Sequence, residues 1–239
     1  DITCNALETI FEIKNIQGNP LFQKLVYPEL DRIHDSMRFS VESSSQEYGN
    51  FKENLDEHDV GMIIHLFWKI EEFIMIEKEW VSSDSLFSNE LYTILLNVDY
   101  SNSICARLAN DIGTLEREIG SEFHTNSASH LCQDVLNELN INISLKNVVD
   151  ELSINDLVSS EKEIIKREIL MYLDIFKIKD KLFDHFYIHL SLLKFYSQEV
   201  KDINNSFADK IAEGIEDLYT GKLALLMQYL IMRHFKGVT

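Results

Sequence analysis

The sequence has few residues that interrupt helices. Its 239 residues include only eight glycines and two prolines, whereas hairpins and tight turns depend on the special backbone angles of these two residue types. Apolar residues recur three and four positions apart rather than two, which is typical of helices with one buried face. A fold rich in β-hairpins is therefore excluded. Because 45% of the residues are hydrophobic, we expect residues 1–239 to form a single-domain, all-α helical bundle with one core.

Basic residues are also scarce. The chain has 22 lysines and arginines but 40 aspartates and glutamates, which gives a formal net charge of −18. Such a charge excludes a nucleic-acid-binding protein, because phosphate backbones attract positive surfaces, and it disfavours docking on anionic lipid. A diphosphate can still bind when metal ions accompany it, since the cations reverse the sign of the local field.

Cysteines and long apolar runs are both limited. Cys4, Cys105 and Cys132 are odd in number and form no Cys-x-x-Cys pair, which excludes a disulfide framework and a zinc knuckle and favours a reducing, cytoplasmic location. No run approaches the roughly 20 apolar residues that cross a bilayer, so we expect no integral membrane protein. The chain begins with Asp1 rather than Met, and a removed targeting peptide is compatible with this expectation.

Apolar periodicity and helix-ending residues divide the chain. Gly18-Asn19-Pro20, Ser43-Ser44-Ser45, the loop at 82–85 and Gly120-Ser121 indicate breaks, and Asn126 is expected to cap a helix. Helices are predicted over residues 3–17, 28–39, 60–80, 100–119, 126–140, 160–177, 180–200 and 207–235.

The helix predicted at 100–119 carries the most informative pattern. Asn110, Thr114 and Glu118 stand at i, i+4 and i+8, a spacing that places them on one stripe of a helix. All three side chains offer oxygen, the ligand that a hard divalent cation such as Mg²⁺ prefers. Arg107 and Arg117 flank them. The pattern therefore predicts a metal-bridged phosphate site.

The motif and several other segments resemble one enzyme family. The spacing Asn-Asp-x-x-Thr-x-x-x-Glu, preceded by Arg-Leu, resembles the second metal-binding motif of plant-type class I terpene synthases. The other similar segments, in the order the family needs, are the helix 68–80 with Glu-x-Glu-Trp, the Glu-Tyr segment 88–92, the loop at Gly120, the helix start 125–129 and the aromatic helix 183–196.

This resemblance implies a fold, a reaction and roles for particular residues. The fold would be the class I terpenoid synthase bundle, and the substrate an isoprenyl diphosphate of 15 or 20 carbons, ionised to a carbocation that is cyclised or quenched. Asn110, Thr114 and Glu118 would hold part of a set of three Mg²⁺ ions, with Mn²⁺ as a substitute. Arg107 and Arg117 would bind diphosphate. The candidates for an aromatic cavity wall are Phe67, Trp68, Phe186, Phe195 and Tyr196. A monomer or a homodimer is expected.

The chain departs from the family at the first metal motif. No complete Asp-Asp-x-x-Asp sequence is present, and only Asp1 and Asn5, four positions apart, stand in the right order to supply ligands from that motif. The interval from Asp1 to Asn110 is also shorter than the family usually has, with the shortening between about 81 and 106. A second acidic cluster, residues 56–59, is interpreted as a solvated helix start.

Two other functions compete with the synthase hypothesis. His185 and His189 are spaced i, i+4, which places both rings on one helix face and is compatible with a non-haem iron protein of the haem-oxygenase-like type. Core and surface histidines are the commoner explanation of such a pair. The incomplete first motif also supports a catalytically silent helical protein that binds a partner.

Overall fold

The computed structural model describes most of the chain and shows helices and turns, with no strand among the described residues. The prediction of an all-α protein is confirmed. The described residues are 18–43, 48–57, 66, 69–70, 72–73, 76, 89–119, 123–152, 157–203 and 206–236. Asp1, Asn5, the predicted helix 3–17 and most of the predicted helix 60–80 lie outside these residues.

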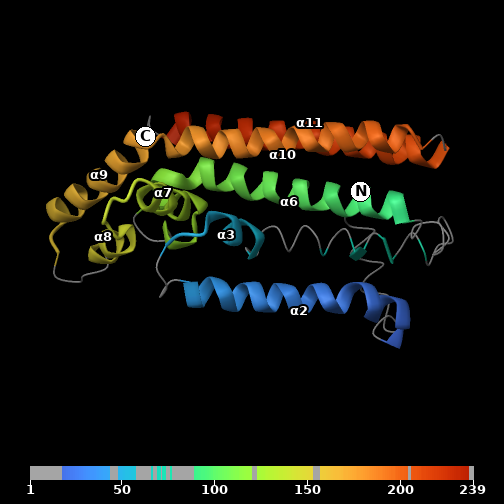
Figure 1. Ribbon diagram of the computed structural model, residues 1–239, viewed down its shortest axis with the longest axis horizontal. Helices are drawn as coiled ribbons and strands as arrows, with labels where there is room; N and C mark the ends of the chain where they lie inside the picture. Colours follow the sequence, from blue (N-terminus) through green and yellow to red (C-terminus); the bar gives the residue numbers. More distant parts are fainter. Residues whose placement is uncertain are drawn as a thin grey trace.

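Three long helices form the main layer of the structure. These are α6 (Asn89–Glu118), α10 (Ile178–Lys201) and α11 (Ser206–Lys236), and they run side by side along the longest axis of the molecule (Figure 1). Apolar side chains from all three meet in the core, where Leu108 and Ile112 of α6 are fully buried. Burial of each such side chain contributes about 1.5–3 kcal/mol.

Glycine lets α6 and α11 approach closely. A Cβ atom on residue 113 would lie 2.6 Å from Cβ of Tyr229 in α11, a separation that real Cβ atoms do not adopt. Gly113 therefore brings α11 against the part of α6 that carries the predicted metal ligands.

Shorter helices cover one end of the main layer. After a 3₁₀ turn, η2 (Phe123–Thr125), come α7 (Ser127–Glu138), α8 (Leu145–Glu151) and α9 (Ser159–Ile175), gathered at the end where α6 finishes and α10 begins (Figure 1). Asn126 caps α7 as predicted, because its Oδ1 accepts a hydrogen bond from Ala128 N at 2.9 Å. Lys177, in the left-handed conformation with φ of 51°, separates α9 from α10.

The predicted start of the second helix was wrong. Helix α2 (Pro20–Ser43) contains Pro28 in its interior, although Pro28 was expected to begin the helix. The helix starts earlier because Asn19 Oδ1 accepts the Leu21 amide at 2.8 Å, and Pro20, at the first helical position, has no amide proton to leave unpaired. Its end at Ser43 agrees with the predicted break.

The short helix α3 (Phe51–Glu57) was not predicted. Its first amides are held by another helix, since Asp134 of α7 accepts Asn50 N through Oδ1 and Phe51 N through Oδ2, each at 2.8 Å. Asp56 was expected at a helix start, but it lies in the last turn of α3 and accepts a hydrogen bond from Tyr100 Oη at 2.7 Å. The prediction that the acidic cluster starts a helix is therefore wrong for Asp56.

Helix α6 begins eleven residues earlier than predicted, at Asn89 rather than residue 100. Ile94, Leu95 and Val98 extend the buried face toward the N-terminal end of α6. The predicted loop at 82–85 lies outside the described residues. Helix α8 was also not predicted. A helix was expected over residues 126–140, and none over residues 145–151.

Candidate functional site

The predicted metal-binding stripe lies in the last three turns of α6 and faces the start of α7. Thr114 and Glu118 are buried, and Asn110 is half-buried. The Thr114 hydroxyl donates its proton to Asn110 O at 2.8 Å, so both lone pairs of the hydroxyl oxygen remain as acceptors. One amide, one hydroxyl and one carboxylate thus share a helix face.

A buried ion pair lies beside this stripe. Arg107 Nε is 2.8 Å from Asp111 Oδ2, and both side chains are only 2% exposed. Arg107 also donates through Nη2 to the carbonyl of Thr125. The sequence hypothesis gave Arg107 the task of binding diphosphate, whereas the structure places its guanidinium between Asp111 and η2. In this position Arg107 joins α6 to the segment that precedes α7.

The start of α7 completes the network. Asp111 Oδ2 accepts a hydrogen bond from the Ser127 amide at 2.9 Å and another from the Ser127 hydroxyl. Asn126 Nδ2 donates to Glu118 Oε2 at 2.8 Å and to Asp111 O at 3.1 Å. We call the residues Arg107, Asp111, Glu118, Asn126 and Ser127 the α6–α7 network. It brings together two segments, 107–118 and 125–129, that each resemble a segment of class I terpene synthases.

Arg117 differs from Arg107 in its exposure. Its side chain is 69% exposed, and Nη2 lies 3.4 Å from Glu118 Oε1. This guanidinium can rotate into solvent while its neighbour Glu118 stays buried. Of the two predicted arginines, Arg117 is the one that an anion arriving from solvent can reach.

The donor set of the stripe fits a hard cation in its chemistry. Asn110, Thr114 and Glu118 supply three oxygens, and each retains acceptor capacity beyond its hydrogen bonds in this structure. Within the described part of the chain, no group of three or more His, Cys, Asp or Glu side chains is placed to hold a metal ion. A cation on the stripe would therefore rely on the amide and hydroxyl oxygens as well as on Glu118.

The predicted aromatic residues are not gathered at the stripe. Tyr196 packs against the apolar cluster that contains Ile94 and Val98 of α6, and these two residues lie roughly 18–24 Å of helix before Asn110. Burial, followed by the charge of Glu199, raises the pKa of Tyr196. Phe186 is fully buried in the core, and Phe195 is 54% exposed. Phe67 and Trp68 lie outside the described residues.

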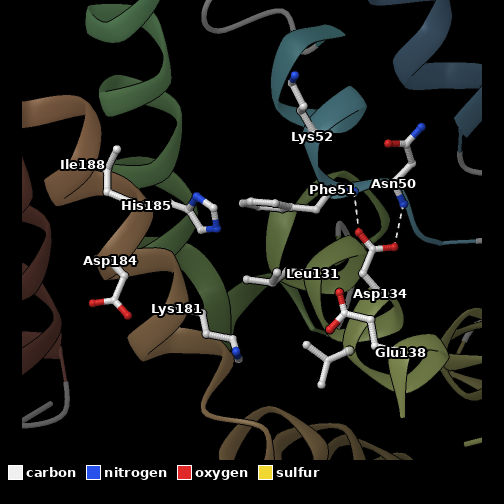
Figure 2. A pocket seen from close by; sticks show the side chains of 11 residues that line it. Asn50, Phe51, Lys52, Leu131, Asp134, Glu138, Lys181, Asp184, His185 and Ile188 are labelled. Carbon is white, nitrogen blue, oxygen red and sulfur yellow. Dashed lines mark hydrogen bonds between the residues drawn. The ribbon is translucent and has the colours of Figure 1, made fainter. Parts of the chain in front are cut away.

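The two histidines line a different part of the molecule. His185 borders a cleft of about 470 Å³ between α3, α7 and α10, and its ring centroid is 4.8 Å from that of Phe51. Figure 2 shows the rings of His185 and Phe51 next to one another at the cleft, with Lys181 and Asp134 below them. His189 lies one turn further along α10 against Tyr100, at 5.6 Å between centroids.

Burial is the first cause of the low basicity of both rings. It lowers the pKa of His185 and of His189. Asp184 partly opposes this at His185, and Asp56 partly opposes it at His189. Burial and the hydrogen bond to Asp56 raise the pKa of Tyr100 to about 12. Each histidine contacts an aromatic ring, and charged side chains, among them Lys181, Asp184 and Glu138, also line the cleft beside His185.

Some residues of these sites were not singled out from the sequence. Asp111 stands four positions after Arg107, and this i, i+4 spacing of opposite charges was a usable signal. Asp134 gave no such signal, because its partners Asn50 and Phe51 precede it by more than 80 residues.

Comparison of the chain with protein-family models, with curated proteins and with solved structures finds no match. None of the described helices combines the length and the apolar character that a membrane span requires.

Proposed function

We propose that the protein is a magnesium-dependent enzyme of the class I terpene synthase type, which ionises an isoprenyl diphosphate of 15 or 20 carbons at the stripe Asn110, Thr114 and Glu118. The contact between α6 and the start of α7 is the observation that carries the proposal. Asn126 and Ser127, from one of the segments that resemble the family, form hydrogen bonds with Glu118 and Asp111 of the other. Two segments whose resemblance was noted independently thus contribute to one buried network.

In this proposal the residues of the chain have distinct tasks. Asn110, Thr114 and Glu118 hold Mg²⁺, which supplies positive charge where the leaving diphosphate becomes more negative. Asp1 and Asn5, as the remnant of the first motif, are the other proposed ligands. Arg117 donates charge-assisted hydrogen bonds to the diphosphate.

Arg107 has a positioning task. Because Asp111 and Thr125 hold its guanidinium, it fixes the distance between α6 and η2. Asn126 then orients the Glu118 carboxylate by donating to Oε2, which leaves Oε1 toward Arg117. The carboxylate keeps its direction without depending on solvent, as a preorganised ligand must.

The test compares two glutamates of the same helix. Glu118→Gln retains an acceptor for Asn126 but removes the charge, and we expect diphosphate release from farnesyl or geranylgeranyl diphosphate with Mg²⁺ to fall at least about 100-fold. Glu116→Gln, at an exposed position two residues away, serves as the matched control and should stay within about twofold of the parent. Binding of Mn²⁺, followed by electron paramagnetic resonance, gives a readout independent of turnover and should weaken only in Glu118→Gln.

Two results would contradict the proposal at different points. Full activity of Glu118→Gln would show that Glu118 is not needed as a metal ligand and that the stripe on α6 does not take part in the reaction. Absence of product and of diphosphate release with geranyl, farnesyl and geranylgeranyl diphosphates would contradict the enzyme itself, and retained Mn²⁺ binding in that case would indicate a catalytically silent scaffold.

A further inference from the structure

Helix α9 carries apolar residues on two opposite sides. Ile165, Ile169 and Leu173 are buried in the core, whereas Ile164, Met171 and Ile175 are 65%, 48% and 62% exposed. We call the exposed three the outer stripe of α9. Their spacing of seven and four places them on one face, and Ile164 and Ile175 are the most exposed large hydrophobic residues in the described part of the chain. The half-buried Glu168 stands between Ile164 and Met171 along this face, and exposed large apolar residues that share one helix face mark an interaction surface.

The charge of α9 is of both signs. The helix carries three basic and four acidic residues, a net charge of −1 over 17 residues, which is close to the average of the whole chain with −18 over 239 residues. A second copy can therefore meet the outer stripe only in an orientation that pairs unlike charges.

Two charged residues beside the stripe favour one orientation. Arg167 and Asp174 are exposed, stand seven positions apart on the same flank of the helix, and form no ion pair among the described residues. When two identical helices pack antiparallel about a two-fold axis, the same flanks face each other. Arg167 of each copy then lies opposite Asp174 of the other, so the ion pair forms twice.

We propose that the outer stripe of α9 is a homodimer contact, in which two α9 helices pack antiparallel. Met171 lies near the two-fold axis, and Ile164 of each copy packs beside Ile175 of the other. Helix α9 crosses the end of the molecule, beyond the ends of the long helices (Figure 1), where a second copy can approach it. The proposal is independent of any reaction at α6.

The size of the stripe sets the expected strength. From Ile164 to Ile175 the helix spans roughly 16 Å, so the contact is smaller than the roughly 1,600 Å² of a standard stable interface. We therefore expect a reversible dimer with a dissociation constant in the micromolar range, populated only at high protein concentration.

Analytical ultracentrifugation of the full chain, from micromolar to near-millimolar concentration, tests the contact. Ile164→Lys combined with Ile175→Lys should raise the dissociation constant at least about tenfold, since lysine at each end of the stripe replaces an apolar contact with a charge that must be desolvated. Met227→Lys is the matched control, because Met227 is 54% exposed but lies on α11, and it should leave the constant unchanged. Circular dichroism verifies that each variant keeps its helix content.

Charge reversal tests the orientation. Arg167→Asp alone and Asp174→Arg alone each place like charges opposite one another and should weaken the dimer about tenfold or more, whereas the combined variant should restore it to within about twofold. A monomer at every concentration overturns the proposal and leaves the stripe to a different partner. A dimer that the stripe variants do not weaken, or one that the combined reversal does not restore, overturns the antiparallel contact.

Discussion

Arg107 and Asp111 form a buried ion pair one helical turn apart, with 2.8 Å between Nε and Oδ2. The pair is the centre of the α6–α7 network, because Arg107 also reaches Thr125 and Asp111 also accepts from Ser127. Because removing both charges from water costs nearly as much as their attraction returns, the intact pair adds little net stability, whereas either charge left buried without its partner is strongly destabilising.

Breaking this pair from one side should be costly. Asp111→Asn keeps the shape of the side chain but leaves the Arg107 charge without its counterion, and we expect the free energy of unfolding to fall by about 3–5 kcal/mol. Urea denaturation monitored by circular dichroism measures the loss. Arg117→Met, at a side chain that is 69% exposed, should change stability by no more than about 0.5 kcal/mol. A loss below about 1 kcal/mol for Asp111→Asn would contradict the buried pair.

Gly113 offers a second test, of the approach between α6 and α11. Gly113→Ala puts a Cβ atom 2.6 Å from Tyr229 Cβ, so one helix must move, and we expect a net loss of about 1–3 kcal/mol despite the better helix propensity of alanine. Gly214→Ala is the control, because no atom lies within 4 Å of the added Cβ, and it should stabilise the protein by about 0.5–1 kcal/mol. Thermal unfolding of both variants decides the matter, and a stabilised Gly113→Ala would contradict the close contact.

The histidines of α10 should make stability depend on pH. Burial lowers the pKa of both His185 and His189 in the folded protein, so the unfolded chain binds more protons once the pH falls below about 6.5. The stability that the neutral rings contribute is complete above that pH and is lost as the pH falls through their folded pKa values. Lys181 acts in the same direction at His185, while Asp184 and Asp56 oppose it.

Unfolding free energies measured between pH 7.5 and 5.5 test this dependence. The parent should lose stability across the range, and a variant with His185→Gln and His189→Gln should lose less. His34→Gln, at a side chain that is 80% exposed, should leave the slope unchanged. Proton resonances of the two rings that titrate at pH 6.5 or above would contradict the expectation.

What the sequence could predict depended on the range of the interactions involved. Asn126 was recognised as a helix cap because it bonds to Ala128, two residues away. Helix α3 was missed because a distant side chain, Asp134, holds the amides of Asn50 and Phe51, and no local pattern indicates such a partner. Helix α8 also has a partner outside the helix, since Gln133 Oε1 accepts the Leu145 amide at 2.8 Å, but its cap Ser144, whose Oγ accepts the Asn147 amide at 3.3 Å, was a local signal that was overlooked. Helices this short do not form on their own propensity.

The same difference between local and long-range interactions applies to the candidate site. The stripe of Asn110, Thr114 and Glu118 follows from helical spacing alone, and the structure places all three in α6 as predicted. The burial of Arg107 follows from tertiary contacts with Thr125 and Asp111, which the spacing of the motif does not contain. Tyr196 was chosen from an aromatic pattern, and pattern alone gave no distance between α10 and the stripe.

The hydrogen bonds that Asp134 accepts from Asn50 and Phe51 also constrain the order in which the protein folds. Seven residues are too few for α3 to persist alone, and its cap is supplied from 83 and 84 residues further along the chain. Helix α7 is capped by its neighbour Asn126 and can form early, whereas α3 must wait for a large loop to close. We therefore expect α3 to be unstructured in the folding transition state, so that its loss accelerates unfolding and leaves the folding rate nearly unchanged.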